Sequence, residues 1–107
     1  MNEIILVTTT FETHQEAEQM ATLVLNKRLA ACAQITGPVT SLYWWQGNID
    51  NTQEYVLTFK STTVLYENLE QSIKENHPYD TPEIVATITS HSSREYRKWL
   101  DKELRND

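Results

Sequence analysis

The run His77–Glu83 (HPYDTPE) constrains the fold of this chain more than any other segment. Each of its prolines, Pro78 and Pro82, fixes its own φ angle and biases the preceding residue away from the helical region. A helix therefore cannot pass through the run, which must connect two separate elements. Because this connector is stiff and carries an imidazole, a phenol and two carboxylates, it is where we expect function to show.

Apolar residues at helical spacing predict three helices. The first begins with a capping box at 13–16 (THQE) and runs to about Arg28 with one apolar face. The second is expected to be capped by Thr62 or Thr63 and to end just before the proline run. The third begins at a second capping box, 92–95 (SSRE). One side of this last helix carries Tyr96, Trp99, Leu100 and Leu104.

Strand patterns fill the segments between these helices. Stretches that are β-branched, alternating or bounded by turn residues are found at 3–9, 30–35, 39–46, 51–61 and 83–89. Small residues leave 30–35 ambiguous, but its place after a helix favours a strand. Gly37-Pro38 predicts a break or bulge, and Gly47-Asn48 predicts the turn of a long hairpin.

The resulting order, βαββαβ followed by a helix, is the split βαβ pattern of ferredoxin-like folds. We therefore expect one α+β domain over residues 1–107, a sandwich of an antiparallel sheet with two helices on one face. The hairpin strands are longer than the strand at 3–9 can cover. Because an unpaired aromatic hairpin is an aggregation hazard, we expect it to pair with another subunit.

The charge and the hydrophobic pattern exclude several classes of protein. A formal net charge of −6 argues against a nucleic-acid binder and against binding to an anionic membrane. No apolar run approaches the roughly 18 residues of a membrane span. The N-terminus lacks the pattern of a signal peptide, so we expect a cytoplasmic protein. No nucleophile elbow, phosphate-binding glycine loop or paired metal-ligand motif indicates an enzyme.

Five segments together resemble the CutA-type divalent-cation tolerance proteins, in the right order and over nearly the whole chain. They are Leu29–Ala33, Ser41–Gly47, Glu54-Tyr55 with Lys60-Ser61, His77–Glu83 and Tyr96–Leu100. The resemblance implies a ferredoxin-like homotrimer in which the hairpin strands complete the sheets of neighbouring subunits. It also implies a link to tolerance of copper and other divalent ions, with copper bound by some members. The architecture is similar to that of nitrogen-regulatory trimers, which bind small ligands between subunits.

Three residues are candidate metal ligands: Cys32, His77 and Glu83. Cys32 offers a soft thiolate for copper, but it also fits a small buried side chain among alanines. His77 offers a ring nitrogen, or it caps the C-terminus of the second helix. Glu83 joins His77 around a pocket, or it pairs with Lys60 in the sheet. One Cys and one His per chain could also assemble a site across a subunit boundary.

A second group of residues is a candidate lining for a cleft between subunits: Tyr43, Trp45, Lys60 and Tyr79, with Glu83. The aromatic residues at 43–45 suggest a stacking platform, although packing inside a trimer explains them as well. The first functional hypothesis is a homotrimer that binds divalent cations, copper above all, and contributes to metal tolerance. The alternatives are a trimeric signalling-type module that holds a small molecule or a partner protein in the cleft, and a structural trimer that supports a partner.

Overall fold

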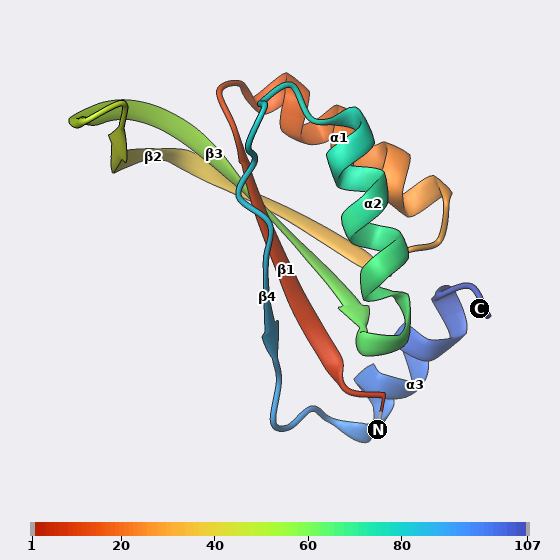
Figure 1. Cartoon of the computed structure of the whole chain (residues 1–107). Helices are drawn as coiled ribbons and strands as arrows, with labels where there is room; N and C mark the ends of the chain where they lie inside the picture. The colour runs from red at the N-terminus through yellow and green to blue at the C-terminus, as the bar shows by residue number, and fades with distance from the viewer. Residues whose placement is uncertain (1, 107) are drawn as a thin grey trace.

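A four-stranded antiparallel sheet with two helices on one face organises the chain (Figure 1). The computed structural model describes residues 2–106. Its elements are β1 (Ile4–Phe11), α1 (His14–Asn26), β2 (Cys32–Trp45), β3 (Asn48–Thr62), the 3₁₀ helix η1 (Thr63–Leu65), α2 (Tyr66–Asn76), β4 (Val85–Ile88) and α3 (Arg94–Glu103). The strand order is β2-β3-β1-β4, so β2 and β4 form the edges. This arrangement confirms the predicted ferredoxin-like α+β fold.

The core lies between the sheet and the helices. By alternation, Val7 of β1 and Leu57 and Phe59 of β3 point to the helical side, and all three are fully buried. Leu69 and Ile73 of α2 and Leu100 of α3 meet them in the same cluster. Leu100 and Leu104 are buried, whereas Trp99, which was expected on the same side of the helix, is 42% exposed.

The predicted breaks and boundaries hold with local corrections. Most of the stretches 30–35 and 39–46 belongs to one strand, β2, whose pairing with β3 shifts by a bulge between Thr36 and Val39. Gly37 sits in this bulge, where an added Cβ would lie 2.8 Å from Cδ2 of Tyr55. The space therefore admits only glycine. α1 ends at Asn26, earlier than predicted, because Arg28 adopts a left-handed φ of 57°.

One of the three predicted helix caps is confirmed as predicted, and a second lies one residue later than its capping box placed it, at Ser93 rather than Ser92. The Thr13 hydroxyl accepts from the Glu16 amide, and the Ser93 hydroxyl accepts from the Tyr96 amide, each at 3.1 Å. The prediction that Thr62 or Thr63 caps the second helix is wrong, because no side-chain cap bond forms at the start of η1 or α2. The side chain of Asn2 takes that role, with its Oδ1 accepting from the Val64 amide at 3.1 Å.

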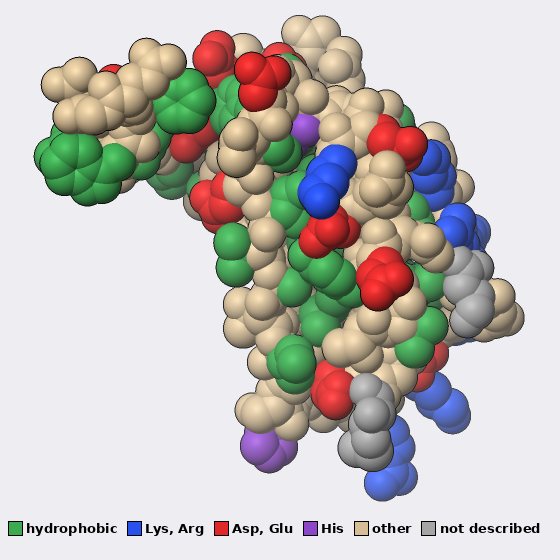
Figure 2. Space-filling view, viewed as in Figure 1, with side chains coloured by type: hydrophobic (Ala, Val, Ile, Leu, Met, Phe, Trp, Pro, Cys, Tyr) green, Lys and Arg blue, Asp and Glu red, His purple; other side chains and the backbone are tan. Residues whose placement is uncertain are grey.

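The long hairpin leaves the body of the molecule, as the strand lengths predicted. β1 ends at Phe11, opposite Tyr55, whereas the β2–β3 pairing continues from Val39–Glu54 to Trp45–Asn48. We call residues 39–54 the arm; Figure 1 shows it projecting beyond the helices. Leu42, Trp44 and Ile49 share one of its faces and are 65%, 73% and 60% exposed. Figure 2 shows hydrophobic side chains gathered at the protruding end of the molecule. None of the helices within residues 2–106 is long and apolar enough to cross a membrane.

The core makes one direct prediction about stability. Leu69→Ala should lower the free energy of unfolding by about 2–5 kcal/mol, because it opens a cavity where the side chain is fully buried. Leu25→Ala removes the same atoms from an exposed position on α1 and should cost less than about 1 kcal/mol. Urea unfolding of both variants measures the difference, and equal losses would contradict the assigned core.

Candidate functional site

His77 replaces a missing strand partner at the end of β1. On the β4 side of β1, the carbonyl of Ile4 accepts a hydrogen bond from the amide of Thr89. Carbonyls of every second residue in a strand point to the same side, so the carbonyl of Thr10 also faces the β4 side. β4 begins at Val85, opposite Thr8, and so stops short of Thr10. Nε2 of His77 lies 2.9 Å from this carbonyl oxygen and donates to it. A buried backbone acceptor is thereby satisfied by a side chain.

The second ring nitrogen of His77 is also occupied. Nδ1 accepts from the Tyr79 amide at 3.1 Å, which fixes the neutral tautomer with its proton on Nε2. The imidazole stacks on the Phe11 ring with centroids 4.3 Å apart. Burial lowers the pKa of His77 below its usual value, although the bond to Thr10 and the carboxylates of Glu16 and Glu54 oppose this shift.

Tyr79 carries the connection from the loop to the base of the arm. Its ring packs against His77 at 4.8 Å, and its hydroxyl donates to Oε2 of Glu54 at 2.9 Å. Burial raises the pKa of Tyr79 above its usual value, and the hydrogen bond to Glu54 and the negative charges of Glu54 and Glu12 add to the shift. The phenol therefore stays protonated and remains a donor.

Glu54 is a functional candidate that the sequence indicated only as part of one of the five family-like segments and not as a site residue. It is only 8% exposed and is the one charged side chain in the buried class within residues 2–106. Its place in an alternating strand predicts a polar, solvent-facing residue, so periodicity could not reveal its burial. The signal that was available is its position in the hairpin just past the end of the predicted strand at 3–9.

Cys32 lies far from this cluster. It starts β2, pairs with Lys60 of β3 and, one strand further, is level with Leu6 of β1. His77 binds Thr10, which is four residues and so about 13 Å further along β1. The two side chains also belong to opposite faces, because Lys60 alternates with Phe59 whereas His77 stacks on Phe11. Cys32 and His77 of one subunit therefore cannot ligate one ion.

The predicted metal trio does not come together in a single subunit. Glu83 is exposed and precedes β4 by two residues. Nowhere in residues 2–106 do three or more His, Cys, Asp or Glu side chains form a group that could hold a metal ion. Cys32 is half-buried, so its thiol is neither sealed in the core nor fully open. A metal site that uses these residues needs more than one copy of the chain.

The residues predicted to line a cleft also lie in separate parts of the subunit. Tyr43 and Tyr79 lie close enough for the phenol of Tyr43 to affect the pKa of Tyr79. Lys60 is six residues along β3 from Glu54, and its ammonium lies 5.5 Å from the centroid of the Tyr96 ring. Among the described residues it forms no salt bridge with Glu83. Trp45 is at the tip of the arm.

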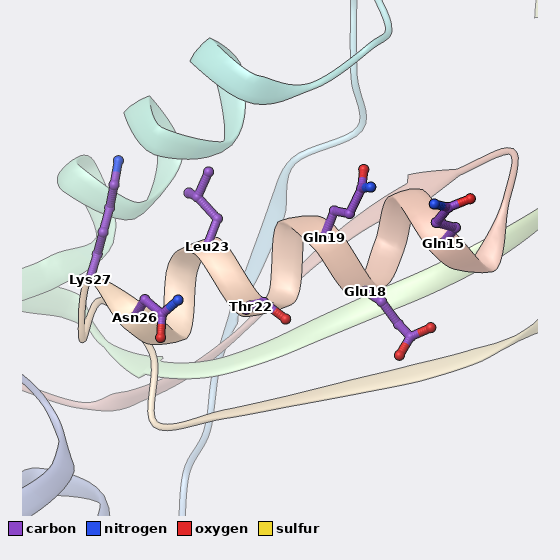
Figure 3. A pocket seen from close by; sticks show the side chains of 7 residues that line it. All are labelled: Gln15, Glu18, Gln19, Thr22, Leu23, Asn26 and Lys27. Carbon is purple, nitrogen blue, oxygen red and sulfur yellow. The ribbon is translucent and has the colours of Figure 1, made fainter.

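A shallow hollow on the surface of α1 does not coincide with these residues. It follows the outer side of α1 and is lined by Gln15, Glu18, Gln19, Thr22, Leu23, Asn26 and Lys27. Figure 3 shows that Leu23 and Lys27 point towards α2 whereas Glu18 points the other way. The ammonium of Lys27 is already bound to the Ser72 hydroxyl at 3.1 Å. With no convergent polar groups, this hollow does not qualify as a ligand site.

Comparison with known proteins gives a consistent result over the whole length. The family described as "CutA1 divalent ion tolerance protein" matches residues 5–103. A divalent-cation tolerance protein CutA of Thermus thermophilus is 40% identical over 100 residues, which cover 94% of this chain and 95% of that protein. The corresponding protein of Citrobacter koseri is 34% identical over 103 residues, covering 96% and 90%.

Solved structures of the same group share the fold. CutA1 from Oryza sativa superposes with a TM-score of 0.95 at 30% identity, covering 98% of this chain and 96% of that one. CutA1 from Pyrococcus horikoshii gives a TM-score of 0.91 at 35% identity, covering 95% and 99%. The likeness therefore extends to the arm and α3 as well as to the sheet.

The lowered pKa of His77 predicts how stability depends on pH. The unfolded chain binds the proton more readily than the folded one, so stability is complete above the unfolded value of about 6.5 and falls as the pH drops below it. The slope due to this residue is at most about 1.4 kcal/mol per pH unit. Chemical unfolding at a series of pH values from 8 to 5 measures it.

His77→Gln should remove this slope, and His14→Gln should retain it because His14 is exposed and sits on the first turn of α1. If the wild type and His77→Gln lost stability equally between pH 7.5 and 5.5, the neutral, buried state of His77 would be wrong.

Proposed function

The chain belongs to the CutA1 family of divalent ion tolerance proteins, and on that premise we propose that it binds divalent cations as a homotrimer and contributes to metal tolerance in the cytoplasm. The observation that carries the proposal is the family match over residues 5–103. Copper is the ion we expect first, because the resemblance associates the family with copper and a thiolate is a soft ligand that suits Cu(I).

The arm supports the self-assembly part of the proposal. Its face of Leu42, Trp44 and Ile49 is left exposed by residues 2–106, and a contiguous apolar surface of this kind marks an interaction site. β4 is a short edge strand on which Val85 and Ile88 are also exposed. A second copy of the chain supplies a surface for the arm, so the hairpin is no longer an open edge.

The metal site of this proposal is shared between subunits. Cys32 stands at the start of the edge strand β2, where a neighbouring subunit can approach it. Glu83 is exposed and can supply an oxygen ligand from a different copy. We assign His77 to the loop and not to the metal, because both its ring nitrogens are already hydrogen-bonded.

Copper binding tests this assignment. Native mass spectrometry of metal-stripped protein titrated with copper should show trimers carrying copper in multiples of three. Cys32→Ala should weaken binding at least about tenfold, because loss of even an outer-shell partner has an effect of that size. The variant His14→Gln/His91→Gln controls for exposed histidines and should keep the wild-type number. Undiminished copper on Cys32→Ala, or an irregular spread of copper numbers, would refute the site.

Assembly has its own test. The melting temperature should rise with protein concentration, since association stabilises the folded subunit by mass action. Trp44→Glu should abolish this dependence and give a monomeric mass in sedimentation, because it buries a charge in the proposed contact. Val64→Glu places the same charge at an exposed apolar site outside the arm and should remain trimeric. A wild type that is monomeric at all concentrations would overturn the trimer.

A further inference from the structure

The arm has little within its own subunit to hold its direction. Beyond Phe11 the sheet is reduced to two strands, and a two-stranded ribbon is marginal by itself. The bulge at Gly37 lies at the same level, and a bulge bends and twists its strand. The junction between body and arm is therefore the place where the hairpin would be expected to swing.

A continuous set of contacts crosses that junction. It begins at the end of β1, where His77 binds the Thr10 carbonyl and stacks on Phe11. It continues through the Tyr79 amide to the Tyr79 hydroxyl, which donates to Glu54 at the base of the arm. Together these contacts connect three parts of the fold: β1, the loop after α2, and β3.

The geometry of these contacts restricts the movement of the side chains that make them. Both hydrogen bonds of the imidazole are made and its plane is only 15° from that of Phe11, so the ring has one position. The two prolines of the loop restrict the backbone that carries Tyr79. On the other face of β3 the ring of Tyr55 meets His14 of α1 edge-on, with centroids 5.6 Å apart. The base of the arm is thus held from both faces.

We propose that the Tyr79–Glu54 hydrogen bond is a latch that fixes the angle at which the arm leaves the sheet and so presents its apolar face to a second copy of this chain. The second half of this inference, that the arm presents its apolar face to another copy, rests on the proposed trimer. Tyr79, His77 and Glu54 are positioning residues in this account: they do not contact the second copy but set where the arm meets it. A buried carboxylate bound by a phenol suits this purpose, because such a charge-assisted bond is strong and directional.

Tyr79→Phe tests the latch by removing one oxygen while keeping the ring against His77. Hydrogen–deuterium exchange of the arm amides, residues 39–54, should accelerate by about tenfold, the factor expected for one hydrogen bond to a charged group. Exchange in the body, at β1 and α2, should stay at the wild-type rate. The concentration at which the trimer dissociates, measured by sedimentation, should rise by a similar factor.

The chain offers a matched control. The Tyr66 hydroxyl donates to Glu70 at 2.7 Å on α2, so Tyr66→Phe removes the same kind of bond away from the arm. It should change neither the arm exchange nor the assembly. Because Tyr79→Phe leaves the Glu54 carboxylate buried without its phenol, a second variant, Glu54→Leu, removes the latch without an unpaired charge. It should reproduce the faster arm exchange in a folded body.

The outcomes separate the latch from the trimer. Wild-type arm exchange in both Tyr79→Phe and Glu54→Leu would overturn the latch, even if the wild type is a trimer. A wild type that never associates would overturn the trimer and with it the second half of the inference. Exchange measured on that monomer would still decide whether the bond fixes the arm. Faster arm exchange together with weaker assembly supports both halves.

Discussion

The end of β1 at Phe11 is the constraint on which the rest of the structure depends. β1 is the strand that pairs with both β3 and β4, so its length sets how far the packing of sheet against helices can extend in the body. Where it stops, the hairpin loses its third strand and becomes an arm. The same ending leaves the carbonyl of Thr10 without a strand partner and creates the position that His77 fills. Arm and loop are therefore two consequences of one short strand.

The contact between Tyr79 and Glu54 also depends on where β1 ends. A carboxylate on a sheet strand usually faces solvent or pairs with a cation. Glu54 is buried instead, and it lies directly beyond Tyr55, the β3 residue that pairs with the last residue of β1. The loop after α2 crosses this point on its way to β4, so Tyr79 can meet Glu54 there. The proposed metal ligand Cys32 belongs to a different region, the far end of the sheet, so the cation site that we propose lies between subunits.

Periodicity was sufficient to predict the fold, because each strand and helix buries one face in a regular way. It also predicted the bulge and the unpaired hairpin, since both depend on local residues and on strand lengths. It failed where the determining contact is distant in the sequence. Asn2, not Thr62 or Thr63, caps the second helical segment, and the contact spans most of the chain.

The site was less predictable for the same reason. Whether Cys32 can share an ion with His77 depends on strand register, which no local pattern gives. The polar loop stands out in the sequence, but the role of His77 required knowing where β4 begins. Glu54 was not identified as a site residue because alternation assigns a residue to a face of the sheet without saying what covers that face.

The placement of the tryptophans has a practical consequence. Trp44 and Trp45 both lie on the arm and are mainly in solvent, and Trp99 on α3 is also partly exposed. None of the three is in the hydrophobic core. Intrinsic emission from this protein thus originates chiefly at its protruding end, and the molecule contains its own optical label there. Spectral position and collisional quenching would follow whether that end is wet or covered, without any probe being attached.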